Sequence, residues 1–201
     1  MTATAASIVW LVFEGCWLML RWQPNRHARK TPVRYSGRDV REFAAMGVSL
    51  AGLGVVPLYY VASHLLHFGT RALAFADYPF MPVLGYLGVA AAAASLWLFY
   101  RTHRDLGHNW SVSLDLRERH TLVTTGVYAL VRHPMYAGFW LMALAQVLLL
   151  PNWIAGPAGL VGFGILYFGR LRREEDMMIA AFGDEYRNYM RRTARVVPWL
   201  Y

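Results

Sequence analysis

Four long stretches of this 201-residue chain carry almost no charge. The runs without Asp, Glu, Lys or Arg are residues 43–70, 78–100 and 133–169, and residues 2–20 contain only Glu14. A bilayer core is about 30 Å thick, and a helix needs roughly 20 apolar residues to cross it. One soluble domain cannot bury four such runs. We therefore predict an all-α, multi-pass integral membrane protein.

The last charge-free run is too long for a single crossing. It contains LPNWIAGP at residues 150–157, whose proline, asparagine and glycine residues favour a turn. We predict that two short spans form a helical hairpin around this turn, which gives five transmembrane helices in one domain, residues 1–201. The predicted spans are residues 5–21, 43–67, 79–101, 134–150 and 153–170.

Basic residues are concentrated in three segments that flank the predicted spans. Of the 20 Lys and Arg residues, seven lie in 21–41, five in 101–132 and seven in 170–195. Because cytoplasmic loops of membrane proteins are enriched in positive charge, we expect these segments to face the cytoplasm. The net charge of +8 also suits anionic lipid headgroups, whereas its dispersal along membrane borders argues against nucleic-acid binding.

Two polar residues of the first span bear on possible chemistry. Cys16 is the only cysteine, which excludes an internal disulfide and a cysteine-based zinc site, and we predict no metal site. An ionisable residue inside a span, such as Glu14, is costly and often functional. A protonated or hydrogen-bonded carboxyl that serves packing explains Glu14 equally well.

An Arg-His-Pro-x-Tyr motif opens the predicted hairpin. Pro134 suits the first turn of a helix, where its missing N–H costs nothing. Arg132 and His133 then lie beside the free N–H groups of that turn, where an anion such as a carboxylate can bind. Gly138, one turn further, could let a ligand approach the backbone. The simpler alternative is that the Arg and the His anchor a span at the membrane surface.

An acidic pair, Glu174 and Glu175, follows the predicted hairpin. Arg170 and Glu174 are four residues apart and could form an ordinary helical ion pair. The functional alternative is a carboxylate beside the ammonium or sulfonium group of a cofactor. Because the hairpin is short, we expect the acidic pair and the Arg-His-Pro-x-Tyr motif at the same end of the membrane.

The segment from about Leu106 to Pro198 resembles the C-terminal half of isoprenylcysteine carboxyl methyltransferases and their bacterial relatives. The matching strings are LGHNWS, HTLVTTGVYALVRHPMYAG, RREED and FGDEYRNYMRR. Phospholipid N-methyltransferases are similar in the Arg-His-Pro and Glu-Glu elements. The resemblance implies S-adenosylmethionine as cofactor, bound by residues 102–198 with a cytoplasmic C-terminal helix, a lipophilic acceptor, and a bacterial inner membrane location.

The resemblance also suggests roles for individual residues. The predicted cofactor-binding residues are His120, Leu122, Val123, Gly126, Tyr128, His133, Tyr136, Gly138 and Glu175. We expect Arg132 and Glu174 near the transferred methyl group, with Arg170 as a further catalytic residue that can hold an acceptor. Asn109 and Trp110 are expected to contact the acceptor.

The function that these features predict is methyl transfer to a lipophilic acceptor, most simply a carboxylate of the isoprenylcysteine type. A carboxylate is already anionic and needs chiefly to be held in line with the methyl group. A phospholipid amine and a small isoprenoid or thiol stay open as acceptors. Two alternatives of another class are an NADPH-dependent sterol-type reductase, which has many more spans, and a non-catalytic membrane protein.

Overall fold

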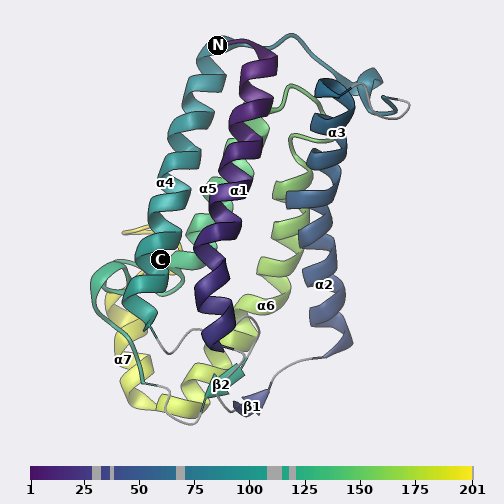
Figure 1. Ribbon diagram of the computed structural model, residues 1–201. Coiled ribbons are helices and arrows are strands. Elements are labelled where there is room, and N and C mark those ends of the chain that lie inside the picture. The colour runs from purple at the N-terminus through teal and green to yellow at the C-terminus, as the bar shows by residue number, and fades with distance from the viewer. Residues whose placement is uncertain (29–32, 37–38, 67–70, 108–114, 118–120, 201) are drawn as a thin grey trace.

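The computed structural model describes residues 1–28, 33–36, 39–66, 71–107, 115–117 and 121–200. Its long helices run side by side along one axis, and the shorter α7 lies at the end where α6 finishes (Figure 1). The helices are α1 (Ala3–Ala28), α2 (Val40–Leu50), α3 (Val56–Leu65), α4 (Pro82–Leu106), α5 (Pro134–Leu149), α6 (Ala158–Phe182) and α7 (Asp184–Arg192).

Within the described residues, three helical stretches are long and apolar enough to cross a bilayer. They are Ala3–Trp22, Val40–Leu65 and Pro82–Leu106, and the apolar α5 is shorter. Large apolar side chains on these stretches are exposed, as Val12, Leu58 and Val83 show, which suits a surface in contact with lipid rather than water. The length, composition and exposed apolar side chains of these helices confirm the prediction of a helical membrane protein.

One short pairing of strands departs from the all-α prediction. Strand β1 (Val33–Ser36) pairs antiparallel with β2 (Asp115–Arg117). The two strands belong to the basic segments that follow α1 and α4, and the end of α6 lies at the same end of the bundle (Figure 1). The basic segments therefore share one end, as predicted, whereas the assignment of this end to the cytoplasm stays a prediction.

A π-helical turn, η1 (Ala51–Val55), joins α2 to α3 in one continuous rod. Pro57 lies in the first turn of α3, where a proline cannot donate a backbone hydrogen bond to the preceding turn, and a π-turn is one way of accommodating such a break. Next to it the rod touches α6 closely, because a Cβ on Gly162 would lie 2.7 Å from the carbonyl oxygen of Val48. Such small residues let helix backbones approach one another.

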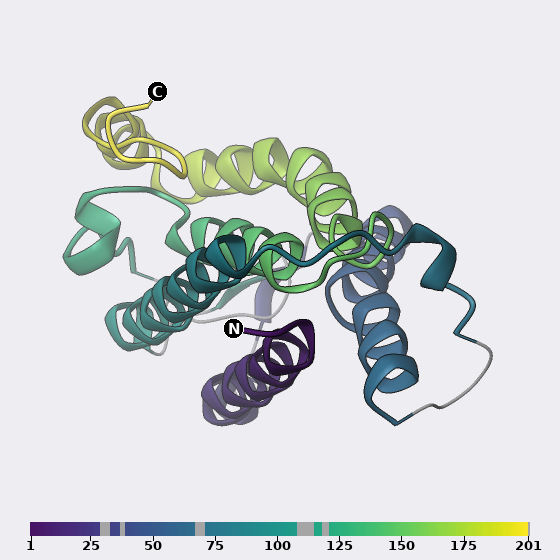
Figure 2. The ribbon, with the colours of Figure 1, turned by 90° about the horizontal axis from the view of Figure 1, so that it is seen from above.

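Helices α5 and α6 form the predicted hairpin, and α5 lies between α4 and α6 (Figure 2). The turn is locked by two fully buried amides, Gln146 and Asn152. Gln146 Nε2 donates to the carbonyl of Gly52 at 3.1 Å, and the carbonyl oxygen of the Asn152 side chain accepts from the Ala155 backbone at 2.8 Å. Because residues 153–157 belong to this turn, helix α6 begins only at Ala158, later than the predicted span start at residue 153.

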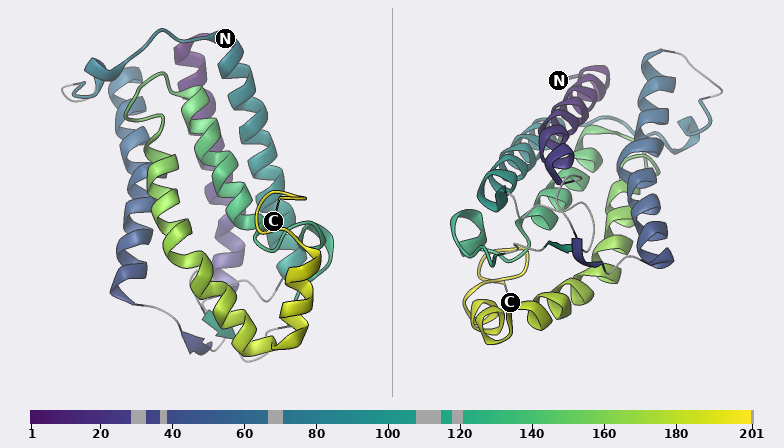
Figure 3. Two further views of the ribbon diagram at one scale, coloured as in Figure 1. Left: turned by 180° about the vertical axis from the view of Figure 1, so that it is seen from behind. Right: turned by 60° about the horizontal axis from the view of Figure 1, so that its bottom comes forward.

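Helix α6 continues well beyond its apolar part. It carries Arg170, Glu174 and Glu175 on consecutive turns and ends at Gly183, whose φ of 55° is in the left-handed region. Glycine adopts this conformation without steric cost and commonly ends helices. The chain then turns into α7, and the tail that follows α7 runs back beside the start of α5 (Figure 3).

Candidate functional site

The start of α5 meets the C-terminal tail. His133 precedes the helix and Pro134 occupies its first turn, as predicted. The backbone N–H groups of Arg132 and His133 donate to the carbonyls of Ala194 and Arg195 at 2.8 and 2.9 Å. The tail therefore lies directly beside the Arg-His-Pro motif.

Glu175 lies at the centre of a buried ionic cluster. Its carboxylate accepts from Arg132 Nε at 3.1 Å and from Arg195 Nη2 at 2.9 Å, and His133 Nε2 lies 3.4 Å away. The side chains of Glu175 and Arg132 are only 5% and 7% exposed. The acidic pair and the Arg-His-Pro motif thus lie at the same end of the hairpin, as predicted, and they are in contact there.

The surroundings of Glu175 keep its carboxylate ionised. Burial alone raises the pKa of this group, because it disfavours the charged form. Hydrogen bonds from His133 and Arg195, together with the charge of Arg132, outweigh burial and lower the pKa of Glu175 to about 2. The group therefore carries its negative charge throughout the physiological range.

Glu174 belongs to a second set of contacts, on the other side of His133. The Tyr136 hydroxyl donates to one Glu174 oxygen, and Arg170 Nε lies 3.5 Å from the same oxygen. The His133 and Tyr136 rings stack, with centroids 5.3 Å apart. Burial raises the pKa of Glu174, but the charge of Arg170 and the hydrogen bond from Tyr136 lower it below its usual value.

Arg170 also reaches a residue that the sequence did not predict. Its Nη1 lies 3.4 Å from Glu42 Oε1, and Glu42 belongs to the first turn of α2. Asp39 caps this turn by accepting from the Glu42 backbone at 2.8 Å. The D-x-x-E spacing is visible in the sequence, but it signals a helix start and gives no indication of a partner on α6.

Arg132 has a structural task besides its pairing with Glu175. Its Nη1 donates to the carbonyls of Met190 and Thr193, so one guanidinium joins the segment before α5 to α6 and to the end of α7. Arg195, which pairs with Glu175, was not predicted from the sequence as a site residue. It is one of several arginines in the C-terminal region, and nothing in the local pattern distinguishes it.

The segment before α5 is held by a partly buried contact with α4. Gly126 opens the 3-10 turn η4 (Gly126–Ala129) with a φ of 63°, and Asp105 accepts from the next backbone N–H, Val127, at 2.9 Å. The carbonyl of Tyr128 accepts from the Tyr189 hydroxyl of α7 at 2.6 Å. The predicted residues Gly126 and Tyr128 thus pack between α4 and α7.

A pocket of about 370 Å³ lies between this segment and α7. Its volume is within the range that is usual for small-molecule binding sites. Leu122 is the predicted residue that lines it, whereas the contributions of α7 were missed. The lining residues are Leu122, Thr124, Ala129, Glu185, Asn188, Tyr189, Arg192 and Thr193.

Some predicted site residues lie elsewhere. His120, Asn109 and Trp110 are outside the described residues. Gly138 faces α4, where a Cβ would lie 3.3 Å from the Phe99 ring, and its carbonyl accepts from Ser95 at 2.9 Å. The close packing of α5 against α4 therefore explains why a small residue stands at position 138. Val123 is half-buried and does not line the pocket.

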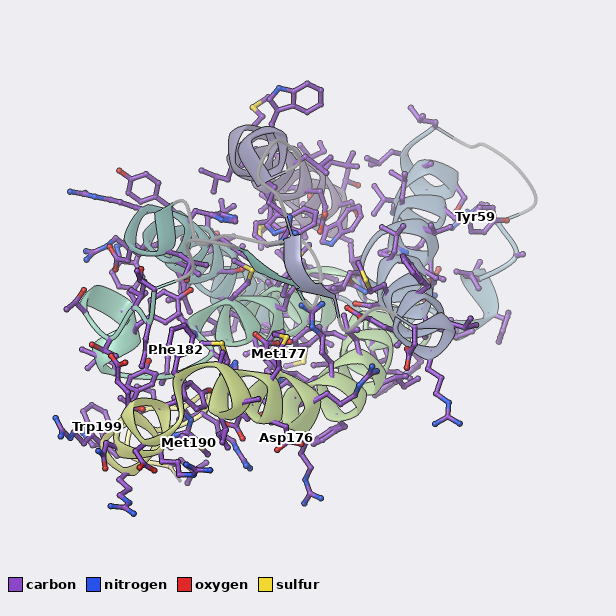
Figure 4. The ribbon with its side chains drawn as sticks, turned by 90° about the horizontal axis from the view of Figure 1, so that it is seen from below. Tyr59, Asp176, Met177, Phe182, Met190 and Trp199 are labelled. Carbon is purple, nitrogen blue, oxygen red and sulfur yellow. The ribbon has the colours of Figure 1, made fainter. Side chains whose placement is uncertain are left out.

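The view along the axis shows how α6 presents its two sides (Figure 4). Met177 and Phe182 lie on the side that faces the bundle, and Asp176 lies on the opposite, exposed side. Glu175 is buried although its neighbour Asp176 is exposed, because adjacent helical residues point in different directions. Of the acidic run, Glu174 and Glu175 therefore form the inward-facing pair.

Fold and site together define a class: a helical membrane protein with a buried ionic cluster and an adjoining pocket at one end of a helical hairpin. Residues 85–180 match the model of the isoprenylcysteine carboxyl methyltransferase (ICMT) family. This match, which runs from α4 through most of α6, covers just under half of the chain, and in that part the chain is similar to the family.

Three relatives illustrate the extent of the similarity. The protein-S-isoprenylcysteine O-methyltransferase of Schizosaccharomyces pombe is 35% identical over 79 residues, 39% of this chain and 34% of that protein. The Mus musculus protein of the same name is 34% identical over 92 residues, 46% of this chain and 32% of that protein. The Arabidopsis thaliana protein-S-isoprenylcysteine O-methyltransferase B is 33% identical over 89 residues, 44% and 45% of the two chains. The matches thus span well under two thirds of each relative.

Proposed function

We propose that this chain is an S-adenosylmethionine-dependent methyltransferase that methylates a carboxylate on a lipophilic acceptor of the isoprenylcysteine type. The observation that carries the proposal is the buried contact of Arg132 and His133 with Glu175, inside the segment that matches the family. The names of the relatives support the same reaction and substrate class.

The residues present suit this cofactor. Its ammonium and sulfonium groups are cations, and Glu174 and Glu175 offer carboxylates whose lowered pKa keeps them charged. Leu122, Ala129 and the Tyr189 ring offer the neighbouring pocket an apolar surface for the adenine. When bound, the cofactor supplies a methyl group that is activated on its sulfonium sulfur.

The protein's own task is to bind and orient. The guanidinium of Arg170 has five donors, so its contacts with Glu42 and Glu174 leave donors for an acceptor carboxylate. Tyr136 fixes the orientation of Glu174 through its hydroxyl. An amine acceptor would need a base to remove its proton, and the lowered pKa of Glu174 makes it a poor one, which favours the carboxylate.

The proposal includes an orientation in the membrane. The hairpin of α5 and the apolar part of α6 supplies two further spans beside the three long ones, which gives five. The end that carries the basic segments and α7 faces the cytoplasm, most simply at a bacterial inner membrane. The cofactor then arrives from the cytoplasm, and the acceptor arrives laterally from the lipid.

Calorimetric titration of the detergent-purified protein with S-adenosylhomocysteine tests the cofactor class, with NADPH titrated in parallel. We expect saturable binding of S-adenosylhomocysteine and no binding of NADPH. Binding of NADPH alone would support the reductase alternative, and binding of neither would support a non-catalytic membrane protein.

A further inference from the structure

Glu42 is a buried acid that the family segment does not contain. It lies on α2, its side chain is 2% exposed, and its Oε1 is 3.4 Å from Arg170 Nη1 on α6. Acidic side chains are almost never fully buried unless they are paired. The burial of Glu42 against Arg170 therefore calls for a physical reason.

The packing of α2 against α6 does not by itself explain why Glu42 is buried against Arg170. The two helices run antiparallel and touch through glycine-mediated contacts, where Gly162 lies against the Val48 carbonyl. At the other end, beyond Glu42, an exposed ion pair joins Asp39 Oδ2 to Arg173 Nη2 at 3.1 Å. Because burial of an ion pair carries a large desolvation cost, apolar residues would dock the helices at least as well.

The contact does fix the position of Arg170. A guanidinium is planar and presents its donors in a rigid fork, so two carboxylates at different nitrogens define its plane. Glu42 Oε1 of α2 lies 3.4 Å from Nη1, and Glu174 Oε2, one turn further along α6, lies 3.5 Å from Nε, so the two carboxylates pair with different nitrogens of the guanidinium. Tyr136 donates to Glu174 in turn, so the chain of contacts runs from α2 to the start of α5.

We propose that Glu42 is a positioning residue that holds the Arg170 guanidinium in the plane in which it receives the acceptor's carboxylate. This inference rests on the proposed function. It makes α2, which lies outside the family segment, part of the acceptor site. The pocket beside α7 is lined by other residues, so we expect cofactor affinity to depend little on Glu42.

The test compares Glu42→Gln with Arg173→Gln in the full-length protein. N-acetyl-S-farnesylcysteine serves as the acceptor probe, and S-adenosylhomocysteine affinity is measured in parallel. Arg173→Gln is the matched control, because it removes the exposed ion pair between the same two helices. We expect Glu42→Gln to lower kcat/KM for the probe about tenfold or more, since small misplacements of binding groups have effects of this size.

Two further readouts separate positioning from simple loss of structure. S-adenosylhomocysteine affinity of Glu42→Gln should stay within about twofold of the wild-type value, a change far smaller than the effect on turnover. Glu42→Asp keeps the charge on a shorter side chain, so its kcat/KM should fall between the wild-type and Glu42→Gln values. If Glu42→Gln does not fold, Glu42→Asp decides in the same way, by reduced turnover with intact cofactor affinity.

Wild-type turnover in either folded Glu42 variant overturns the inference, and so does a loss of cofactor affinity as large as the loss of turnover. A wild-type protein that does not methylate the probe overturns the proposed function for this acceptor and the inference with it. An active wild-type protein with an equally active Glu42→Gln variant overturns the inference alone. The two failures are therefore distinguishable.

Discussion

Arg132 and Glu175 form a buried ion pair, with 3.1 Å between Nε and Oε1, across 43 residues of sequence. One partner precedes α5 and the other lies in α6 beyond its apolar part. The same guanidinium donates hydrogen bonds to the carbonyls of Met190 and Thr193. The pair thus links the hairpin to the C-terminal tail, at the site that we propose for the cofactor.

Neutralising Glu175 should weaken cofactor binding. Glu175→Gln keeps the shape of the side chain but removes its charge, and a hydrogen bond to a charged group is worth about 1.5–3 kcal/mol, or roughly tenfold to a hundredfold in affinity. Calorimetry with S-adenosylhomocysteine measures the change. Asp176→Asn, at the exposed neighbouring position, is the control and should bind normally. Equal affinities in both variants would contradict the assignment of Glu175.

The same substitution should change the response of stability to acid. The pKa of Glu175 is about 2 when folded, below its ordinary value of 4.5. The folded state therefore binds fewer protons than the unfolded state, and the stabilisation is complete above pH 4.5 and is lost as the pH falls towards 2. Melting temperatures between pH 7 and pH 3 should fall more steeply for the wild-type protein than for Glu175→Gln. Parallel curves would show that Glu175 does not titrate in this way.

Replacing Arg132 by lysine should loosen the tail. Lysine keeps the charge but cannot reach Glu175 and two backbone carbonyls with one planar fork. A carbonyl left without its partner costs about 1–3 kcal/mol, so the melting temperature should fall. Hydrogen exchange should speed up in residues 193–200. The exposed Arg191→Lys serves as control, and unchanged exchange in Arg132→Lys would exclude a role of Arg132 in holding the tail.

The contact between α2 and α6 should tolerate no methyl group at Gly162. A Cβ there would meet the Val48 carbonyl at 2.7 Å, and overpacking of this kind costs about 1–3 kcal/mol. Gly169, on the same helix, has open space, so Gly169→Ala should be neutral or stabilising through helix propensity. Thermal unfolding in detergent compares the two. A Gly162→Ala protein as stable as Gly169→Ala would show that the helices do not pack this closely.

Local signals in the sequence predicted much of the fold. The charge-free runs predicted the apolar helices, and Pro134 predicted the start of α5. Each of these features depends on a few neighbouring residues, through backbone geometry or hydropathy. The strand pairing of β1 with β2 joins segments far apart in the sequence, and their short stretches have no distinctive pattern.

The site was predictable in part for the same reason. The hairpin forces Arg132 and His133 towards Glu175, so connectivity alone brings them together. Glu42 and Arg195 come from α2 and the tail, and their partners depend on how those elements pack. The contact of Gly138 with the Phe99 ring likewise depends on how α5 packs against α4, whereas its predicted ligand contact stays a prediction.

The most direct test of the proposed reaction is transfer of a labelled methyl group from S-adenosylmethionine to N-acetyl-S-farnesylcysteine by the purified protein. N-acetylcysteine, which lacks the lipid, is the control. We expect label in the farnesylated compound alone, released as methanol by mild alkali, as a methyl ester requires. Label that resists alkali, or label that appears only in phospholipid amines, would contradict carboxyl methylation.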